Sequence, residues 1–381
     1  MFTRSSSARR TPLLLAAAAM ALVPLAACAP PQSDSTSAET DSGVKVDEAT
    51  SAQDFGGMDK LVAAAKKEGE LNTIALPPDW ANYGNIISAF SDKYGIKVNS
   101  AQPDAASQDE INAANQQKGK SSAPDVFDLG QSVALANTAM FAPYQVTDFD
   151  QIPDEFKDPD GAWVNDYGGY MSIGYDSSKV SPITSVDDLL QPELKGKVAL
   201  NGDPTQAGAA FSGVVMAALS QGGSADDVAP GVDFFAKLKD AGNFLPVDPT
   251  PATIESGQTP VVIDWDYLNA AETAKLPSWK VVVPENAAVA GYYFQAINKD
   301  APHPAAARLW QEFLYSDEGQ NLWLAGGARP VRADAMVEAG SIDQKAYDAL
   351  PEVSGDPVIV SEDQAATATK YLQANWAKAI G

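Results

Sequence analysis

Apolar residues follow two alternating patterns along the chain, one with the spacing of a helix face and one in short β-branched runs. Helical spacing covers Met58 to Glu68 and Asn85 to Tyr94, and a glycine follows each segment. The strand-like runs Leu71 to Leu76 and Ile96 to Val98 come directly after these glycines. Alternation of helix and strand is typical of an α/β protein with a doubly wound sheet of parallel strands.

The same alternation continues to the end of the chain. The expected strands are 125–129, 170–175, 197–200, 261–263, 279–283 and 291–297. The expected helices with two bounds are 107–118, 185–190, 303–315 and 317–324, and most of 333–381 is expected to be helical. Further helices are expected to begin at 130 and 268 and to end at about 219 and 241. A chain of 381 residues is long enough for two lobes with separate cores. We expect the chain to pass into a second lobe after the strand 170–175 and to return at 291–297.

Four short stretches rich in polar and aromatic residues share one position in this pattern. They are 79–83, 130–132, 202–206 and 264–267, and each follows an expected strand and opens an expected helix. Ligands of open α/β sheets bind at the carboxyl ends of the strands. Because two of the stretches belong to each lobe, they predict a ligand cleft between the lobes that can close about a hinge.

The stretch 264–267 carries much of the candidate chemistry. Asp264 and Asp266 alternate with Trp265 and Tyr267 where a buried type of strand meets a helix. Aromatic faces attract cations, and nearby carboxylates neutralise them. The alternative interpretation of this stretch is that Trp265 fills a core and Asp266 caps the helix.

Composition and charge exclude several kinds of partner. The chain has 45% hydrophobic and 20% charged residues, as ordinary soluble globular proteins do. Its formal net charge of -24 argues against binding nucleic acid or anionic lipid through a basic face. We therefore expect no nucleic-acid partner.

The N-terminal residues have the features of an export signal, a basic start followed by an apolar segment too short for a stable membrane anchor. The sequence Leu-Ala-Ala-Cys at 25–28 resembles a bacterial lipobox, which implies cleavage before Cys28 and a diacylglycerol group on its sulfur. The alternative is an ordinary secretory signal in which Cys28 has no role. Residues 1–27 are thus the predicted lipoprotein signal peptide, and the polar residues 28–54 are a predicted disordered tether.

Signatures of catalysis are scarce. Cys28 is the only cysteine, which leaves no intramolecular disulfide and no cysteine-ligated metal cluster. The single histidine, His303, lies at an expected helix start, and the motifs of nucleophile elbows, zinc proteases and dinucleotide-binding loops do not occur. A hydrolase that uses carboxylates alone stays open in principle. We expect no enzymatic activity, no cofactor and no metal centre.

Four segments carry a resemblance to a known family: Asp-Trp-Ala-Asn-Tyr at 79–83, the segments 184–198 and 310–320, and Gly-Ala-Arg-Pro at 327–330. With them, the body from about Leu61 to Arg332 resembles the extracellular solute-binding proteins of ABC importers. The likeness is greatest to the spermidine/putrescine-binding branch, and the ferric-ion-binding branch comes next.

This resemblance implies a periplasmic-binding-protein-like α/β fold of type II with two lobes, a doubly wound mixed sheet in each, and a ligand cleft between them. The expected boundaries are 55–170 for the first part of lobe 1, 171–290 for lobe 2, and 291–381 for the return to lobe 1 and the C-terminal helices.

The resemblance also implies ligand-binding residues. In the polyamine branch, the equivalents of Trp80 and Tyr83 line the ligand channel, Trp265 resembles a second-lobe Trp, and Asp203 matches an acid that contacts the polyamine. The full set of predicted ligand-binding residues is Trp80, Tyr83, Gln131, Ser132, Asp203, Gln206, Asp264, Trp265, Asp266, Tyr267, Tyr293 and Arg329.

The chain departs from the polyamine branch in ways that leave the ligand open. Gln206 replaces a second acid, and Arg329, beside a cleft position, is awkward for a polyamine. Asp264 and Asp266 could supply the missing charge. The adjacent pair Tyr292-Tyr293 could be phenolate ligands of iron, or two strand residues that face opposite sides.

We therefore expect a monomeric receptor, lipid-anchored to the outer face of the cell membrane through Cys28. It would bind a small, polyamine-like organic cation and deliver it to an ABC permease with a cytoplasmic ATPase. The alternative ligand is an anion or a ferric complex, held by the helix N-termini at Ser132 and Thr205 and by Arg329. A surface adhesin or an enzyme that kept the fold is a third hypothesis.

Overall fold

The computed structural model describes residues 39–40, 42–350, 353 and 357–381. The predicted signal peptide and the predicted lipidation site, Cys28, lie outside these residues.

The segment before the first long helix is packed onto the body, which corrects the predicted boundary of the tether at residue 54. Val46, Ala49 and Ala52 are buried. The guanidinium of Arg308 fixes the same segment, because its Nε donates a hydrogen bond of 2.7 Å to the backbone oxygen of Ala49. A few apolar residues in a polar stretch are thus sufficient to pack this segment onto the body. The average composition of the stretch did not indicate this.

The strands occupy the following residues. They are β1 (Glu70–Ile74), β2 (Lys97–Ala101), β3 (Val126–Leu129), β4 (Phe141–Ala142), β5 (Val164–Asp176), β6 (Val198–Leu200), β7 (Val261–Trp265), β8 (Trp279–Val282), β9 (Val289–Asn298), β10 (Arg329–Pro330) and β11 (Val358–Ile359).

The α-helices follow the predicted pattern closely, with α7 as an addition. They are α1 (Met58–Glu68), α2 (Tyr83–Tyr94), α3 (Ser107–Gln117), α4 (Gln131–Ala136), α5 (Gly208–Ser220), α6 (Ala229–Asp240), α7 (Pro251–Glu255), α8 (Asp266–Glu272), α9 (Pro304–Leu314), α10 (Asp317–Ala325), α11 (Ala333–Ala339), α12 (Gln344–Tyr347) and α13 (Glu362–Ile380). The expected helix 185–190 is a 3₁₀ helix over Val186–Leu190. Among the described helices, none combines the length and the apolar character needed to span a bilayer.

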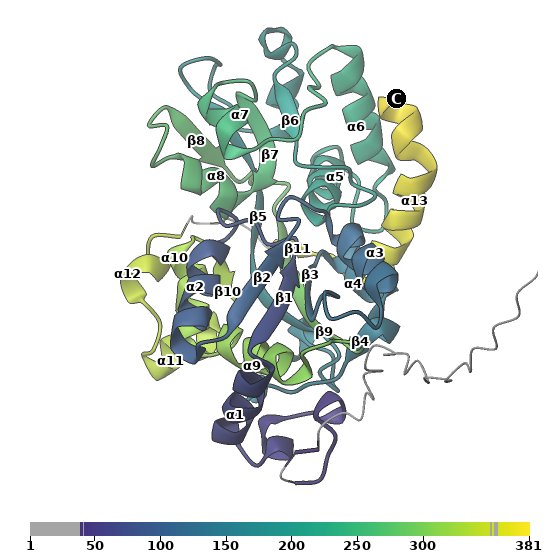
Figure 1. Cartoon of the computed structure of the whole chain (residues 1–381). Helices are drawn as coiled ribbons and strands as arrows, with labels where there is room; N and C mark the ends of the chain where they lie inside the picture. The colour runs from purple at the N-terminus through teal and green to yellow at the C-terminus, as the bar shows by residue number, and fades with distance from the viewer. Residues whose placement is uncertain (1–38, 41, 351–352, 354–356) are drawn as a thin grey trace, which may run out of the picture. The chain divides into compact units, whose positions relative to one another are not determined.

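The long strand β5 runs through both halves of the large sheet (Figure 1). Its first half pairs with β9 and β10, and its second half pairs with β7 and β8, all antiparallel. Strand β6 pairs parallel with β7, whereas β3 and β4 pair antiparallel with β9. The sheet is therefore mixed. This confirms the mixed sheet that the resemblance implies, whereas the parallel pairing expected from the alternation of helix and strand is limited, in the described residues of this sheet, to β6–β7 and β9–β11.

Strands β1 and β2 form a separate small parallel sheet. The helices α1 and α2 end at Gly69 and Gly95, whose φ angles of 75° and 69° are left-handed and stop each helix. The loops that leave β1 and β2 at their carboxyl ends lead to α2 and α3. This arrangement places Trp80 and Asp104 in loops at the same end of the small sheet.

The C-terminal helix α13 packs against helices from both parts of the chain. It contacts α6 from the segment that follows β5, and α4 from the segment that precedes it (Figure 1). The rings of Trp376 and Phe235 meet at 5.3 Å between centroids. The helix thus braces the two parts, as the sequence suggests.

Candidate ligand-binding site

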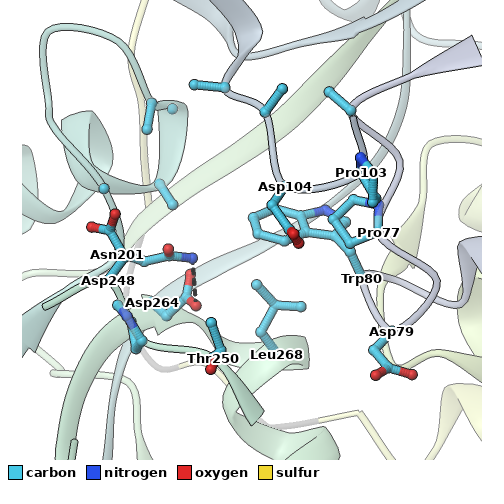
Figure 2. Close-up of a pocket in the computed structure, with 18 of the residues that line it drawn as sticks. Pro77, Asp79, Trp80, Pro103, Asp104, Asn201, Asp248, Thr250, Asp264 and Leu268 are labelled. Carbon is cyan, nitrogen blue, oxygen red and sulfur yellow. Dashed lines mark hydrogen bonds between the residues drawn. The ribbon is translucent and has the colours of Figure 1, made fainter. Parts of the chain in front are cut away.

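A pocket of about 480 Å³ is lined by residues at or just after the carboxyl ends of β1, β2, β3, β6 and β7. Figure 2 shows two facing walls. One wall holds Pro77, Trp80, Pro103 and Asp104, from the loops after β1 and β2, and the other holds Asn201, Asp248, Thr250 and Asp264, from the chain around β6, α7 and β7. Asp128 at the end of β3 and Tyr293 of β9 also line the pocket. The predicted arrangement, with strand ends of two parts of the chain around one cavity, is present.

The walls of this pocket are strongly acidic. The carboxylates that line it are Asp79, Asp104, Glu110, Asp128, Asp203, Asp248, Asp264 and Glu272. Among the described residues that line the pocket, there is no Lys, Arg or His. Because like charges in one cleft add their potentials, an acidic lining of this kind favours cations over anions.

The eight acids fall into an exposed group and a buried group. Asp79, Asp104, Asp203 and Asp248 are exposed, and Glu110, Asp128, Asp264 and Glu272 are buried. Exposed charges act mainly by steering a ligand toward the pocket, whereas buried charges act on the bound ligand at short range in a medium of low dielectric.

Burial disfavours the ionised form of the inner acids. Burial raises the pKa of Asp264 to about 7, against the opposing hydrogen bond from Asn201. Burial likewise raises the pKa of Asp128 to about 7, against hydrogen bonds from Tyr83 and Tyr167. The pKa of Glu110 rises well above its usual value through burial and through the charge of Asp128. A cationic ligand beside these groups would restore the ionised form.

Asp264 and Asp266 have different surroundings, although they are two residues apart. Asp264 lines the pocket, and its two oxygens accept hydrogen bonds of 2.8 Å from Asn201 Nδ2 and from the backbone N–H of Trp265. Asp266 lies outside the pocket lining and accepts from the backbone N–H groups of Tyr170 and Tyr267, at 2.9 and 3.0 Å. Asp266 therefore connects the start of α8 with β5 by hydrogen bonds. This is close to the helix-capping role, one of the two interpretations of this residue.

The predicted aromatic residues are split between the wall and the core. Trp80 is half-buried in the wall, and Tyr293 lines the pocket with its ring 5.7 Å from that of Trp80. Tyr83, Trp265 and Tyr267 are buried and do not line the pocket. Trp265 lies against the backbone of Gly291, where a Cβ would approach its ring to 2.4 Å.

The remaining predicted residues also divide. Asp203 and Gln206 line the pocket, and Gln131, Ser132 and Arg329 do not. Gln131 Nε2 donates a hydrogen bond of 2.5 Å to the backbone oxygen of Val360. The guanidinium of Arg329 lies 4.9 Å from the ring centroid of Tyr170.

Two features account for the absence of Ser132 and Arg329 from the pocket lining. Gly130 and Gly208, at the starts of α4 and α5, approach so closely that a Cβ on Gly130 would lie 3.0 Å from the Cα of Gly208. The start of α4 thus lies against the start of α5, whose Gly208 lines the pocket. Arg329 lies in β10, which pairs with the first half of β5, at Gly168.

The sequence did not single out several residues of the site. Asp128 and Asn201 stand at the ends of β3 and β6, so the rule that ligands bind at strand ends could have found them. Asp104, Asp248 and Glu272 lie in loops or at a helix end, and no local pattern distinguishes them from other surface acids. Tyr167 of β5 lies behind the pocket wall and carried no signal of its own.

The chain matches the family model described as "Bacterial extracellular solute-binding protein" over residues 124–350. No curated protein matches it significantly in sequence. Among solved structures, it is similar to the periplasmic binding protein AgtB of A. tumefaciens R10 in complex with agropinic acid, with a TM-score of 0.66 and 15% identity over 82% of this chain and 98% of that chain.

Two further structures show that this fold is shared by proteins with different ligands. The periplasmic binding protein AfuA of Actinobacillus pleuropneumoniae, with fructose-6-phosphate bound, has a TM-score of 0.64 and 18% identity over 82% and 98% of the two chains. The spermidine/putrescine-binding protein PotD of Streptococcus pneumoniae has a TM-score of 0.55 and 16% identity over 82% and 99%. These likenesses show the two-lobed fold and leave the branch open. Because the family model covers more than half of the sequence, this chain belongs to the bacterial extracellular solute-binding proteins.

Proposed function

We propose that this solute receptor of an ABC importer binds a small organic cation of the polyamine type. The observation that carries the proposal is the charge of the pocket, with eight carboxylates and, among the described lining residues, no basic side chain. Four of these acids are buried, and burial raises their pKa values, so a cation beside them would favour the ionised form that binds it. The half-buried face of Trp80 adds an aromatic surface on which an alkylammonium group can stack.

Asp128, a buried acid of the pocket lining, has one oxygen without a hydrogen-bond partner in the described part of the chain. Asp128 Oδ2 accepts hydrogen bonds from the hydroxyls of Tyr83 and Tyr167, at 2.7 and 3.1 Å. Its other oxygen, Oδ1, has no hydrogen-bond partner among the described residues. Because Oδ1 is fully buried as well as unpartnered, an ammonium group in the pocket would act on Asp128 by compensating its charge.

An anion is less favoured than a cation by the same observations. Arg329, the cation expected to hold a carboxylate or phosphonate, lies outside the pocket lining. The backbone N–H of Thr205 already donates to Asp203 Oδ1 at 2.8 Å. An anion would thus face eight acids without any of the three donors that the alternative requires, since Ser132 also lies outside the pocket lining.

A ferric ion bound by phenolates is also less favoured. The ring of Tyr292 packs against Phe156 at 4.6 Å between centroids, whereas Tyr293 stacks on Tyr167 at 5.4 Å, so the two tyrosines face different surroundings. Burial raises the pKa of Tyr292 to about 12 and raises that of Tyr293 further, which disfavours phenolate formation.

The proposal includes a hinge and an address. Strands β5 and β9 would be the hinge segments, with lobe 1 over 55–170 and 291–381 and lobe 2 over 171–290. The mature protein would be a monomer anchored outside the cell through Cys28 and would deliver its ligand to the permease, with no catalytic step.

A thermal-shift screen tests the proposed ligand class. Ligands that bind only the folded state raise its apparent stability. Putrescine, spermidine and thiamine should raise the melting temperature, and fructose-6-phosphate, phosphonates and ferric citrate should not. A shift with the anions alone would refute the cation proposal and leave the receptor role intact.

A further inference from the structure

A buried chain of hydrogen bonds runs behind the pocket wall. The indole Nε1–H of Trp80 donates to the hydroxyl oxygen of Tyr167 at 2.7 Å, and that hydroxyl donates to Asp128 Oδ2 at 3.1 Å. From the other side, Gln295 Nε2 donates to the hydroxyl oxygen of Tyr83 at 2.9 Å, and Tyr83 donates to the same Asp128 oxygen at 2.7 Å. The chain thus connects an aromatic wall residue with a buried acid of the pocket.

Tyr167 is the member of this chain that contacts the most parts of the wall. It is fully buried and does not itself line the pocket. It contacts Trp80 and Asp128 by hydrogen bonds, and its ring stacks on that of Tyr293 at 5.4 Å with an interplanar angle of 3°. These three partners come from the loop after β1, from β3 and from β9, and all three line the pocket.

The surroundings of Tyr167 leave it little freedom. Its ring also stacks on Trp323 at 4.2 Å, and the backbone of β5 fixes its position. Trp80, in contrast, lies in a loop in which Ala75, Ala81 and Asn82 have positive φ angles of 58°, 43° and 72°. No strand or helix sets the direction of the indole, which is fixed by its hydrogen bond to Tyr167 and by edge contacts with the rings of Tyr267 and Tyr293, at 6.4 and 5.7 Å.

We propose that Tyr167 is a positioning residue, which holds the indole of Trp80 and the carboxylate of Asp128 in the relative orientation that a stacked cation requires. The role in binding rests on the proposed function, and the role in fixing Trp80 does not. In this arrangement the ring of Trp80 stays in the pocket wall, and the carboxylate of Asp128 stays beside it.

The first experiment needs no ligand. The chain has seven tryptophans, so a spectrum of the ¹⁵N-labelled mature protein should show seven indole N–H signals, and Trp80→Phe identifies the one that belongs to Trp80. In the unmutated protein this proton should exchange slowly with solvent, because its partner is buried. Rapid exchange would overturn the proposal, and this measurement does not depend on any Tyr167 variant folding.

The second experiment removes one hydroxyl. Tyr167→Phe should shift the Trp80 indole signal and speed its exchange. Tyr144→Phe is the matched control, because Tyr144 is also buried and its hydroxyl donates to a carboxylate oxygen, Glu312 Oε1, at 2.8 Å. Neither Tyr144 nor Glu312 lines the pocket. The control should leave the Trp80 signal in place. An unchanged signal in folded Tyr167→Phe would overturn the proposal.

The third experiment separates positioning from general loss of structure, with putrescine as the probe. Tyr167→Phe should weaken putrescine binding about tenfold, the factor that about 1.4 kcal/mol represents. In a Trp80→Phe background the same change should cost less than about threefold, because a residue that acts through Trp80 has nothing left to position. Equal costs in both backgrounds would overturn the proposal. If the unmutated protein binds no cation, the proposed function fails, and the indole measurements alone decide the role of Tyr167.

Discussion

Replacing Asp264 by Asn should weaken cation binding and at the same time stabilise the empty protein. Asp264 is 6% exposed, and within the described part of the pocket lining no basic residue accompanies it. Losing one partner of a desolvated charge pair costs about 2 to 5 kcal/mol. At pH 8, where a carboxyl with a pKa of about 7 is mostly ionised, the cation should therefore bind about 30-fold more weakly or worse.

The stability effect has the opposite sign. Because folding raises the pKa of Asp264 from 3.8 to about 7, the folded state binds an extra proton between these values, and stability falls as pH rises through this range. An asparagine side chain at this position would carry no such cost, because it does not ionise. At pH 8 Asp264→Asn should thus raise the free energy of unfolding by roughly 2 to 4 kcal/mol, because one pKa unit corresponds to about 1.4 kcal/mol, and the gain should vanish near pH 4.

Urea unfolding and equilibrium titration with spermidine, each at several pH values, measure both effects. For the unmutated protein, affinity should fall about tenfold from pH 8 to pH 6, since a group with a pKa near 7 is then mostly protonated. Asp264→Asn should reduce this dependence. Asp176→Asn is the control for affinity alone, because Asp176 is buried outside the pocket lining and pairs with Lys179 at 3.6 Å. Loss of stability with unchanged affinity in Asp264→Asn would refute the reasoning.

Three further predictions concern the exposed acids, Arg329 and the lipid anchor. Neutralising the exposed acids Asp104 and Asp248 together should slow cation association severalfold at low salt and change the dissociation rate little. Stopped-flow fluorescence can measure both rates, and equal effects at low and high salt would contradict a steering role. Arg329→Ala should change cation affinity less than about twofold, because Arg329 does not line the pocket, whereas abolished binding in a titration would favour the anion. Cys28→Ala should remove labelling by a radioactive fatty acid while the protein still folds, and undiminished labelling would exclude Cys28 as the lipidation site.

Much of the fold could be predicted because the local pattern was strong. The helices α1, α2, α9 and α10 have regular apolar spacing, with glycine stops or polar starts. The start of β5 at Val164 could not be predicted, because Asp166, Gly168 and Gly169 resemble a loop. These glycines are required by close neighbours, since a Cβ on Gly168 would lie 2.3 Å from the oxygen of Gly291, which is distant in sequence.

The candidate site was predictable to the extent that strand ends mark it. This rule placed Trp80, Asp203 and Asp264 in the pocket lining. It could not separate residues that line the pocket from those behind it, such as Tyr83 and Trp265. Their burial depends on rings from distant segments, for example the contact of Tyr83 with Trp323 at 4.7 Å.

Titration calorimetry of the mature protein at pH 8 tests the central claim most directly, with spermidine and fructose-6-phosphate as ligands of opposite charge. We predict that spermidine binds with one ligand per chain and that its affinity falls as the pH is lowered to 6. We predict no measurable binding of fructose-6-phosphate. Saturable binding of the phosphate, with none of spermidine, would contradict the account of an acidic, cation-selective pocket.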